Sequence, residues 1–109
     1  MGRGVIVARI KPGSEEAVAK IFAESDATDL PYLGKVKHRS IFIKEDLYIH
    51  LVETDGDFDK AVAGIRDHEL FKDVSEQMAP HVLAYNPDTW RSPRDSFARE
   101  IYSWDATDR

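Results

Sequence analysis

The most regular hydrophobic pattern in the chain lies between Lys35 and Glu53, in the sequence KVKHRSIFIKEDLYIHLVE. β-Branched and aromatic residues dominate both halves of this stretch, and such residues are typical of strands. Lys44 and Glu45 separate the two halves, so we expect a hairpin with these residues in its tight turn, although they do not match the Asn-Gly turn signal. The stretch therefore predicts two neighbouring antiparallel strands.

The register of this hairpin decides which side chains share a face. With the predicted turn, Ile41 lies opposite Tyr48 and Arg39 lies opposite His50, and directly opposed residues point to the same side of a sheet. One face then carries Arg39, Ile41, Ile43, Tyr48, His50 and Val52. The other face carries Val36, His38, Ser40, Phe42, Leu47, Ile49 and Leu51. Both faces are largely apolar, so each of them needs a cover.

The segment before the hairpin predicts one strand and one helix. Residues 4–10, GVIVARI, form a short apolar run that is typical of a buried strand. Val18, Ile21 and Phe22 then repeat at the spacing of one helix face, and Ser25 falls on the same face. The end of this helix should therefore bring Ser25, with its neighbour Asp26, toward the sheet.

The segment after the hairpin predicts further helix and strand. Apolar residues repeat at helical spacing in residues 58–65 and again in residues 70–78, with a break between them. Residues 84–96 are polar, contain two prolines and lack a period, so we expect a long loop. Residues 97–104, FAREIYSW, predict a last strand, and residues 105–109 a disordered tail.

The predicted order of elements is β-α-β-β-α-β. This order is typical of the ferredoxin-like α+β fold, a four-stranded antiparallel sheet with helices on one face. The other face, which includes Phe42 and Ile49, would then be a large exposed apolar patch. A second copy of the sheet is the simplest cover, so the pattern predicts a homodimer in the form of a dimeric α+β barrel.

Composition narrows the class of protein. A length of 109 residues fits a single domain spanning 1–109, and 42% hydrophobic residues are sufficient for a modest core. The net charge of −5 and the lack of a basic patch argue against nucleic acid as a partner, and the lack of cysteine excludes disulfides and thiolate metal sites. No apolar run resembles a signal peptide or a membrane span, so we expect a cytoplasmic protein without a membrane partner.

Four segments carry a resemblance to a known family. SDATDLP at 25–31, DLYIHLVE at 46–53, HELFKDV at 68–74 and IYSW at 101–104 resemble the tetracenomycin-type polyketide cyclases of actinomycete bacteria. The resemblance covers nearly the whole chain in the same order. It implies a ferredoxin-like α+β fold, a homodimer formed through the sheets, and catalysis with no metal or organic cofactor. It also implies aldol-type closure and aromatisation of a ring in an aromatic polyketide intermediate of type II biosynthesis.

The same resemblance implies the catalytic residues. The family's pocket arginine corresponds to Arg39, its strand histidine to His50 and its loop aspartate to Asp26. A cationic donor suits the oxyanion that develops in ring closure, and an imidazole can take and return protons near neutral pH. Asp26 could orient His50, act as the base or hold Arg39. The chain departs from the family at Ser25, where the member compared has a histidine.

The hairpin face and the helix stripe together predict a pocket between the helices and the sheet. We expect it to be lined by Phe22, Ser25, Ile41, Tyr48, His50 and Phe71. From the residues alone, Arg39 and His50 are equally consistent with a cross-strand pair that reaches solvent, and Tyr48 with core packing. Trp90 is either an anchor for the long loop or part of a lid.

Three functions remain open from the sequence. The first is a cofactor-independent polyketide cyclase. The second is a cofactor-independent anthrone-type monooxygenase, which would consume oxygen. The third is a non-catalytic polyketide-binding partner of the synthase, which would tolerate replacement of Arg39 and His50. A cyclase would also be expected to contact polyketide synthase components transiently, and fold alone does not separate the three.

Overall fold

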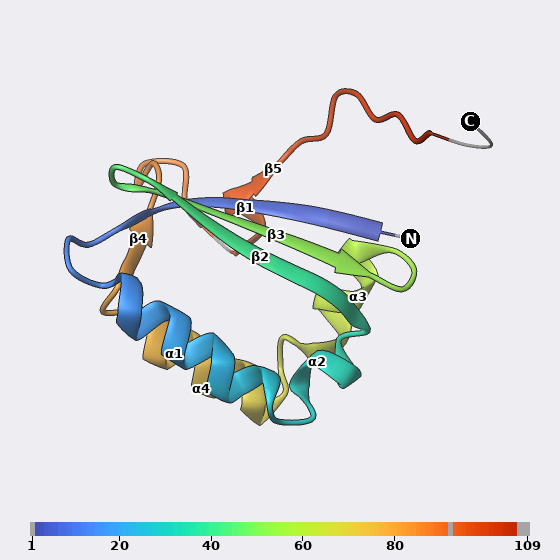
Figure 1. Cartoon of the computed structure of the whole chain (residues 1–109), viewed down its shortest axis with the longest axis horizontal. Coiled ribbons are helices and arrows are strands. Elements are labelled where there is room, and N and C mark those ends of the chain that lie inside the picture. Colours follow the sequence, from blue (N-terminus) through green and yellow to red (C-terminus); the bar gives the residue numbers. More distant parts are fainter. Residues whose placement is uncertain (1, 92, 107–109) are drawn as a thin grey trace.

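An antiparallel sheet forms one layer of the protein (Figure 1). The structure is a computed structural model that describes residues 2–91 and 93–106. The strands run in the order β2-β3-β1-β4, and a short β5 also pairs with β1. Their bounds are β1 Gly2–Ile10, β2 Val36–Lys44, β3 Leu47–Thr54, β4 Val82–Ala84 and β5 Phe97–Ala98. This is the predicted ferredoxin-like arrangement.

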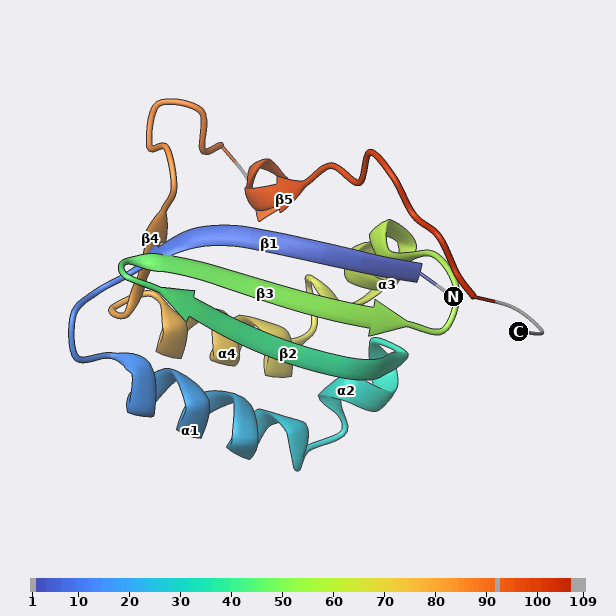
Figure 2. The same ribbon diagram turned by 45° about the horizontal axis from the view of Figure 1, so that its top comes forward.

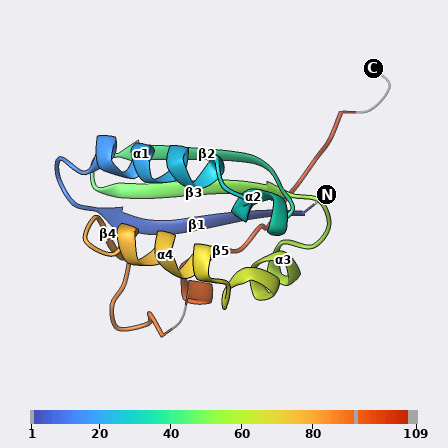
Figure 3. The ribbon, with the colours of Figure 1, turned by 90° about the horizontal axis from the view of Figure 1, so that it is seen from below.

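The helices form a second layer on one face of the sheet (Figure 2). Seen from below, α1 and α4 run along the sheet, and the shorter α2 and α3 lie toward one end of it (Figure 3). Their bounds are α1 Glu15–Asp26, α2 Leu30–Leu33, α3 Phe58–Ile65 and α4 Glu69–Met78, with a 3₁₀ turn η1 at Pro93–Ser96. The predicted break between the two helical patterns after the hairpin is confirmed. Within the described residues, none of the helices is both long and apolar enough to cross a membrane.

Polar side chains mark where the later helices begin. Asp57 accepts a hydrogen bond from the backbone N–H of Lys60, and His68 Nδ1 accepts one from the backbone N–H of Leu70. Both contacts satisfy N–H groups that have no partner within the helix itself. His68 therefore has a structural role at the start of α4.

The predicted hairpin turn was wrong by one residue. Glu45 and Asp46 form the turn, so Lys44 pairs with Leu47. The reason is a contact that lies outside the hairpin: the backbone N–H of Ile10 donates to the Asp46 carbonyl at 2.8 Å, and Arg9 binds the Asp46 carboxylate at 2.9 Å. Strand β1 therefore holds Asp46 in the turn.

The changed turn moves each cross-strand partner by two residues. Ile41 lies opposite His50 and Arg39 lies opposite Val52. A shift by an even number keeps every side chain on its face, because side chains alternate with a period of two. The predicted faces therefore hold, with one exception. The pairing shifts between Val36 and His38, and this irregularity turns Val36 to the helix-covered face instead of the outer face.

The predicted last strand, residues 97–104, was also largely wrong. Only Phe97–Ala98 pairs with β1, and the fourth position of the sheet is taken by Val82–Ala84, directly after α4. This three-residue strand is too short for a period to be read, and it lies between the predicted helix, which ends at residue 78, and the predicted loop, which begins at residue 84. Ile101, Tyr102 and Trp104 are 85%, 79% and 65% exposed. Of the predicted tail, residues 105–106 are exposed and irregular, and residues 107–109 lie outside the described residues.

The core lies between the sheet and the helices. Ala8, Ile10, Val18 and Tyr48 form its buried centre. Gly4 belongs to the same layer, since a Cβ there would collide with the ring of Phe58 at the start of α3. No helix formed by the described residues covers the opposite face of the sheet (Figure 2).

Candidate active site

A cavity of about 530 Å³ lies between the inner face of the sheet and the helices. Six residues expected in or beside the pocket line it: Phe22, Ser25, Arg39, Tyr48, His50 and Phe71. Its other walls are largely apolar and come from α2, α3, α4 and the inner face of the strands. This volume is within the range of small-molecule sites, about 300–1,000 Å³.

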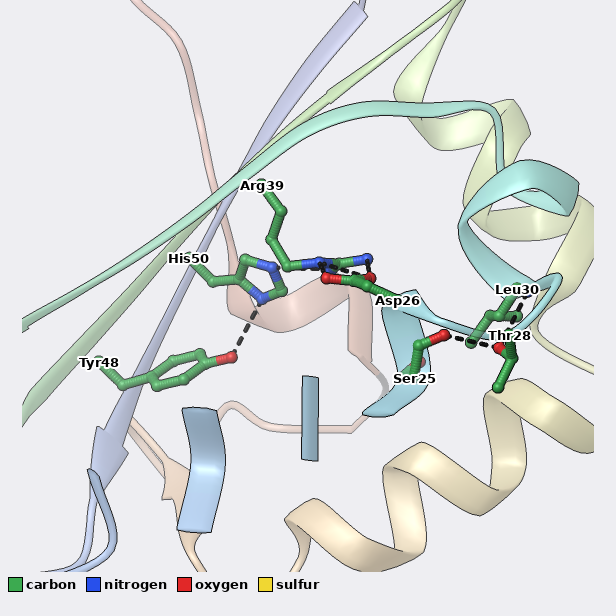
Figure 4. A network of polar contacts seen from close by, with 7 residues as sticks. All are labelled: Ser25, Asp26, Thr28, Leu30, Arg39, Tyr48 and His50. Atoms are coloured by element: carbon green, nitrogen blue, oxygen red, sulfur yellow. Dashed lines mark hydrogen bonds and ion pairs between the residues drawn. The ribbon is translucent and has the colours of Figure 1, made fainter. Parts of the chain in front are cut away.

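Four polar residues form a continuous chain at this cavity (Figure 4). The carboxylate of Asp26 accepts hydrogen bonds from Arg39 Nη2 at 2.9 Å and from Arg39 Nε at 3.2 Å. Arg39 Nη1 lies 3.0 Å from His50 Nε2, and His50 Nδ1 lies 3.0 Å from the hydroxyl of Tyr48. The structure thus brings together the three predicted catalytic residues and adds Tyr48 to them.

Three elements, α1, β2 and β3, position the four members of the chain. Asp26 is the last residue of α1, and Thr28 caps the end of this helix by donating from its hydroxyl to the Ser25 carbonyl at 2.6 Å. Arg39 lies in β2, diagonal to His50 in β3. Diagonal neighbours are about 7–8 Å apart, which a long arginine side chain can span. The contact therefore forms although the two residues are not directly opposed.

The chain runs from a partly exposed end to a buried end. The Asp26 side chain is 40% exposed and that of Arg39 16% exposed, whereas His50 and Tyr48 are 4% and 3% exposed. The Phe22 ring lies under the guanidinium, with Arg39 Cζ 4.9 Å from the ring centre, and its centre is 5.0 Å from that of His50 in an edge-to-face contact. Phe22 therefore packs against both Arg39 and His50.

Burial determines the charge of the two inner groups. Desolvation, followed by the positive charge of Arg39, lowers the pKa of His50 from 6.5 to about 3. Burial raises the pKa of Tyr48 well above its usual value of 10.0, and the nearby Arg39 charge opposes this only in part. At neutral pH His50 is therefore a neutral imidazole and Tyr48 a neutral phenol.

One predicted pocket residue is placed differently. Ile41 is not among the residues that line the cavity, and instead packs against the buried cluster that includes Val18 and Tyr48. It lies on the predicted face of β2, but its side chain is part of the core and not of the cavity wall. His38 is exposed on the outer face as predicted, with its Nε2 2.7 Å from the Ser40 hydroxyl.

Some lining residues were missed by the sequence reasoning. Val36 lines the cavity because of the irregular pairing in β2, and Leu30 and Pro31 because α2 closes one end of the cavity. Trp90 also lines the cavity, from the long loop after β4. A tryptophan in a polar loop was the available signal, but it did not show which way the side chain points.

Two other polar features are poor candidates for the site. A hollow of about 650 Å³ near the start of β1 is lined by glycines and by charged residues such as Arg3, Asp57 and Arg99, and none of the four residues of the polar chain lines it. His81 binds the buried Ser14 hydroxyl at 2.9 Å and links the start of α1 to β4. Among the described residues, no group of three or more His, Asp or Glu side chains is arranged to hold a metal ion.

Comparison with known proteins agrees with this fold. The family model described as polyketide synthesis cyclase matches residues 2–105. The chain belongs to the polyketide synthesis cyclase family. Tetracenomycin F2 cyclase of Streptomyces glaucescens is 40% identical over 106 residues, covering 97% of this chain and 96% of that protein. The solved structure of that enzyme, a type-II polyketide cyclase, superposes with a TM-score of 0.88 at 39% identity and covers 96% of this chain and 98% of its own.

Two further relatives lie within the genus Streptomyces. An uncharacterised protein of Streptomyces coelicolor is 44% identical over 108 residues, covering 98% of this chain and 97% of that protein. The polyketide synthase protein CurG of Streptomyces cyaneus is 37% identical over 105 residues, covering 96% and 98%. The cyclase-family match thus extends over the whole fold that carries the polar chain.

Proposed function

We propose that this chain is a polyketide cyclase that closes and dehydrates a ring of an aromatic polyketide intermediate in type II biosynthesis. The observation that carries the proposal is a largely apolar cavity with one cationic donor, Arg39, among its described lining residues. Apolar walls suit the fused rings of such an intermediate, and the guanidinium suits the oxygen on which charge develops. We further propose that residues 1–109 act as a single domain.

The chemistry of ring closure requires groups of the kind found in the polar chain. A base removes a proton from an acidic methylene, the enolate carbon bonds to a ketone carbon, and the ketone oxygen becomes an alkoxide that takes up a proton. Loss of this hydroxyl and a neighbouring hydrogen as water then aromatises the ring. These steps transfer no electrons to an acceptor, so we propose that the reaction uses no metal or organic cofactor.

Arg39 is suited to stabilise the enolate and alkoxide oxygens. Its contacts with Asp26 and His50 use N–H groups on Nε, Nη1 and Nη2. A guanidinium has five such donors, so it retains N–H groups for a substrate oxygen. The ion pair with Asp26 fixes the plane of the guanidinium before substrate binds, which is the preorganisation that oxyanion stabilisation requires.

The proton is not readily taken by His50 in this arrangement. The lone pair on His50 Nε2 accepts a hydrogen bond from Arg39, and the pKa of the imidazole is lowered to about 3. The Asp26 carboxylate, which is partly exposed, or water is the more suitable acceptor. Much of the rate would then come from folding a flexible chain into one productive conformer within the cavity.

Ring closure by purified variants tests this proposal. Arg39→Ala should lower the rate above the spontaneous background by about 10²–10³, the effect of removing one oxyanion donor. Arg39→Lys should restore little, because lysine lacks the planar forked donors that bind Asp26 and His50 together. Arg66→Ala, at the exposed end of α3, is the matched control and should keep full activity.

The same assay separates the alternatives. Full activity of Arg39→Ala would remove the role assigned to Arg39 and favour a polyketide-binding partner of the synthase. Consumption of oxygen in step with turnover would favour the anthrone-type monooxygenase. Turnover in the absence of oxygen, with loss of activity in Arg39→Ala, is the result expected of the cyclase.

We also propose that the protein acts as a homodimer in the cytoplasm, with transient contacts to synthase components. Support for the dimer comes from the sheet face that the helices leave uncovered. Phe42, Ile49 and Val7 lie in one row across β2, β3 and β1 on that face, and Phe42 is 56% exposed. A second copy of the sheet would remove this row from water.

A further inference from the structure

The direction of the hydrogen bonds along the polar chain follows from the chemistry of its members. A guanidinium has donors and no acceptor, so Arg39 Nη1–H must donate to His50 Nε2. A neutral imidazole carries its proton on one nitrogen only, and this proton is then on Nδ1. His50 Nδ1–H donates in turn to the Tyr48 oxygen at 3.0 Å. Arg39 therefore dictates the tautomer of His50.

The surroundings of His50 leave no good alternative. An imidazolium would direct a second N–H toward the Arg39 donor. His50 is only 4% exposed, so water could not separate the two donors. The opposite neutral tautomer, with the proton on Nε2, would place two N–H donors against each other at 3.0 Å. Both arrangements break a buried hydrogen bond, which costs more than the bond itself contributes.

The tautomer of His50 determines how the Tyr48 hydroxyl is used. Its oxygen accepts from His50, so its own O–H hydrogen is not used in that bond. Among the described residues, His50 Nδ1 is the hydrogen-bond partner found for this hydroxyl, and Tyr48 lines the cavity although it is 3% exposed. A buried donor beside a cavity needs an acceptor.

We propose that Arg39 holds His50 in the Nδ1–H tautomer, and that His50 thereby holds the Tyr48 hydroxyl as a hydrogen-bond donor toward a substrate oxygen. The inference rests on the proposed cyclase function for the identity of the ligand. His50 is then a positioning residue, and Tyr48 contacts substrate. Arg39 and Tyr48 then both present donors to the cavity, so the polar chain favours ketone and enolate oxygens of the substrate. The apolar walls of the cavity contact the rings of the substrate.

The tautomer is measured without substrate. Two-bond ¹H–¹⁵N spectra of the ¹⁵N-labelled wild-type protein at pH 7.5 report which nitrogen of each histidine carries the proton, and loss of a signal in His50→Gln assigns His50. His68 is the internal control, because its Nδ1 accepts the backbone N–H of Leu70 at 3.1 Å and must have its proton on Nε2 when neutral. The expected result is opposite tautomers for His50 and His68.

Removing Arg39 tests what sets the tautomer. Neutral histidine in water prefers the proton on Nε2, so Arg39→Met should move His50 toward that form while His68 stays unchanged. A wild-type His50 with its proton on Nε2, or an imidazolium at pH 7.5, would overturn the proposal. This result would leave the proposed cyclase function standing, since it does not depend on turnover.

The donor role of Tyr48 is tested by binding. Tyr48→Phe keeps the ring and removes the hydroxyl, and should weaken binding of a hydroxyanthraquinone probe about 5-fold to 10-fold, the size of one hydrogen bond. Tyr32→Phe, at a side chain that is 86% exposed, is the control and should bind as wild type. Equal affinity of wild type and Tyr48→Phe would refute the donor role even if the tautomer is as expected.

Discussion

Lowering the pH should destabilise this protein through one buried histidine. His50 has a pKa of about 3 in the folded protein, against 6.5 for an exposed imidazole. The unfolded chain therefore binds a proton at this residue below pH 6.5, which the folded chain does not bind until near pH 3. A group whose folded pKa is lowered in this way reduces the free energy of unfolding as the pH falls from 6.5 to about 3. It has little effect on that free energy above pH 7.

The size of the effect follows from the two pKa values. At pH 5 the unfolded state is favoured by the free energy of protonating a group of pKa 6.5, about 2 kcal/mol relative to pH 8. Because the folded-state pKa lies more than one unit below pH 5, this loss is set by the unfolded-state pKa alone. Such a loss is a large part of the stability of a small domain, about 5–15 kcal/mol.

Urea unfolding at pH 7.5 and pH 5.0, at one protein concentration, measures the effect. His50→Gln is the informative variant, since a glutamine amide can accept from Arg39, can donate to Tyr48 and does not titrate. We expect the wild type to lose about 2 kcal/mol more than His50→Gln between the two pH values. His38→Gln, at an exposed histidine, should follow the wild type. Equal losses for wild type and His50→Gln would refute the assignment of a neutral, buried His50.

Four further substitutions test the architecture around the site. Ile49→Asp places a charge in the middle of the uncovered sheet face and should convert a dimer to a monomer in sedimentation at micromolar concentration; a dimer of wild-type stability would contradict the proposed interface. Gly4→Ala forces a Cβ against the Phe58 ring and should cost about 1–3 kcal/mol. Gly64→Ala, where a Cβ meets open space in α3, should stabilise the protein by about 0.5–1 kcal/mol. Equal melting temperatures of Gly4→Ala and Gly64→Ala would contradict both expectations. Trp90→Ala opens one wall of the cavity and should raise KM more than it lowers kcat for ring closure; an unchanged KM would show that Trp90 does not contact substrate.

The alternation of apolar residues by itself determined the layers of this protein. A period of two in the hairpin and helical spacing around Val18 and Phe58 predicted which side chains share a sheet face and which helix residues pack onto the sheet. That result survived an incorrect turn, because the error moved each partner by an even number of residues. The hairpin register placed Arg39 and His50 on one face, but spacing alone does not separate them from a solvent-exposed pair, so their catalytic roles came from the resemblance.

Only the tertiary structure decided the details that carry the chemistry. The turn is held by Arg9 and Ile10 of a distant strand, and the short β4 is defined by its pairing with β1 and not by a pattern of its own. The polar chain of Asp26, Arg39, His50 and Tyr48 joins residues from three elements. It forms because the end of α1 lies beside Arg39, and because Arg39 is a diagonal neighbour of His50 in the hairpin. Local sequence determines which face a side chain points to, whereas the partner it meets depends on contacts between segments that are far apart in the chain. The charge state and tautomer of His50 depend on those contacts, so they were not available from the sequence.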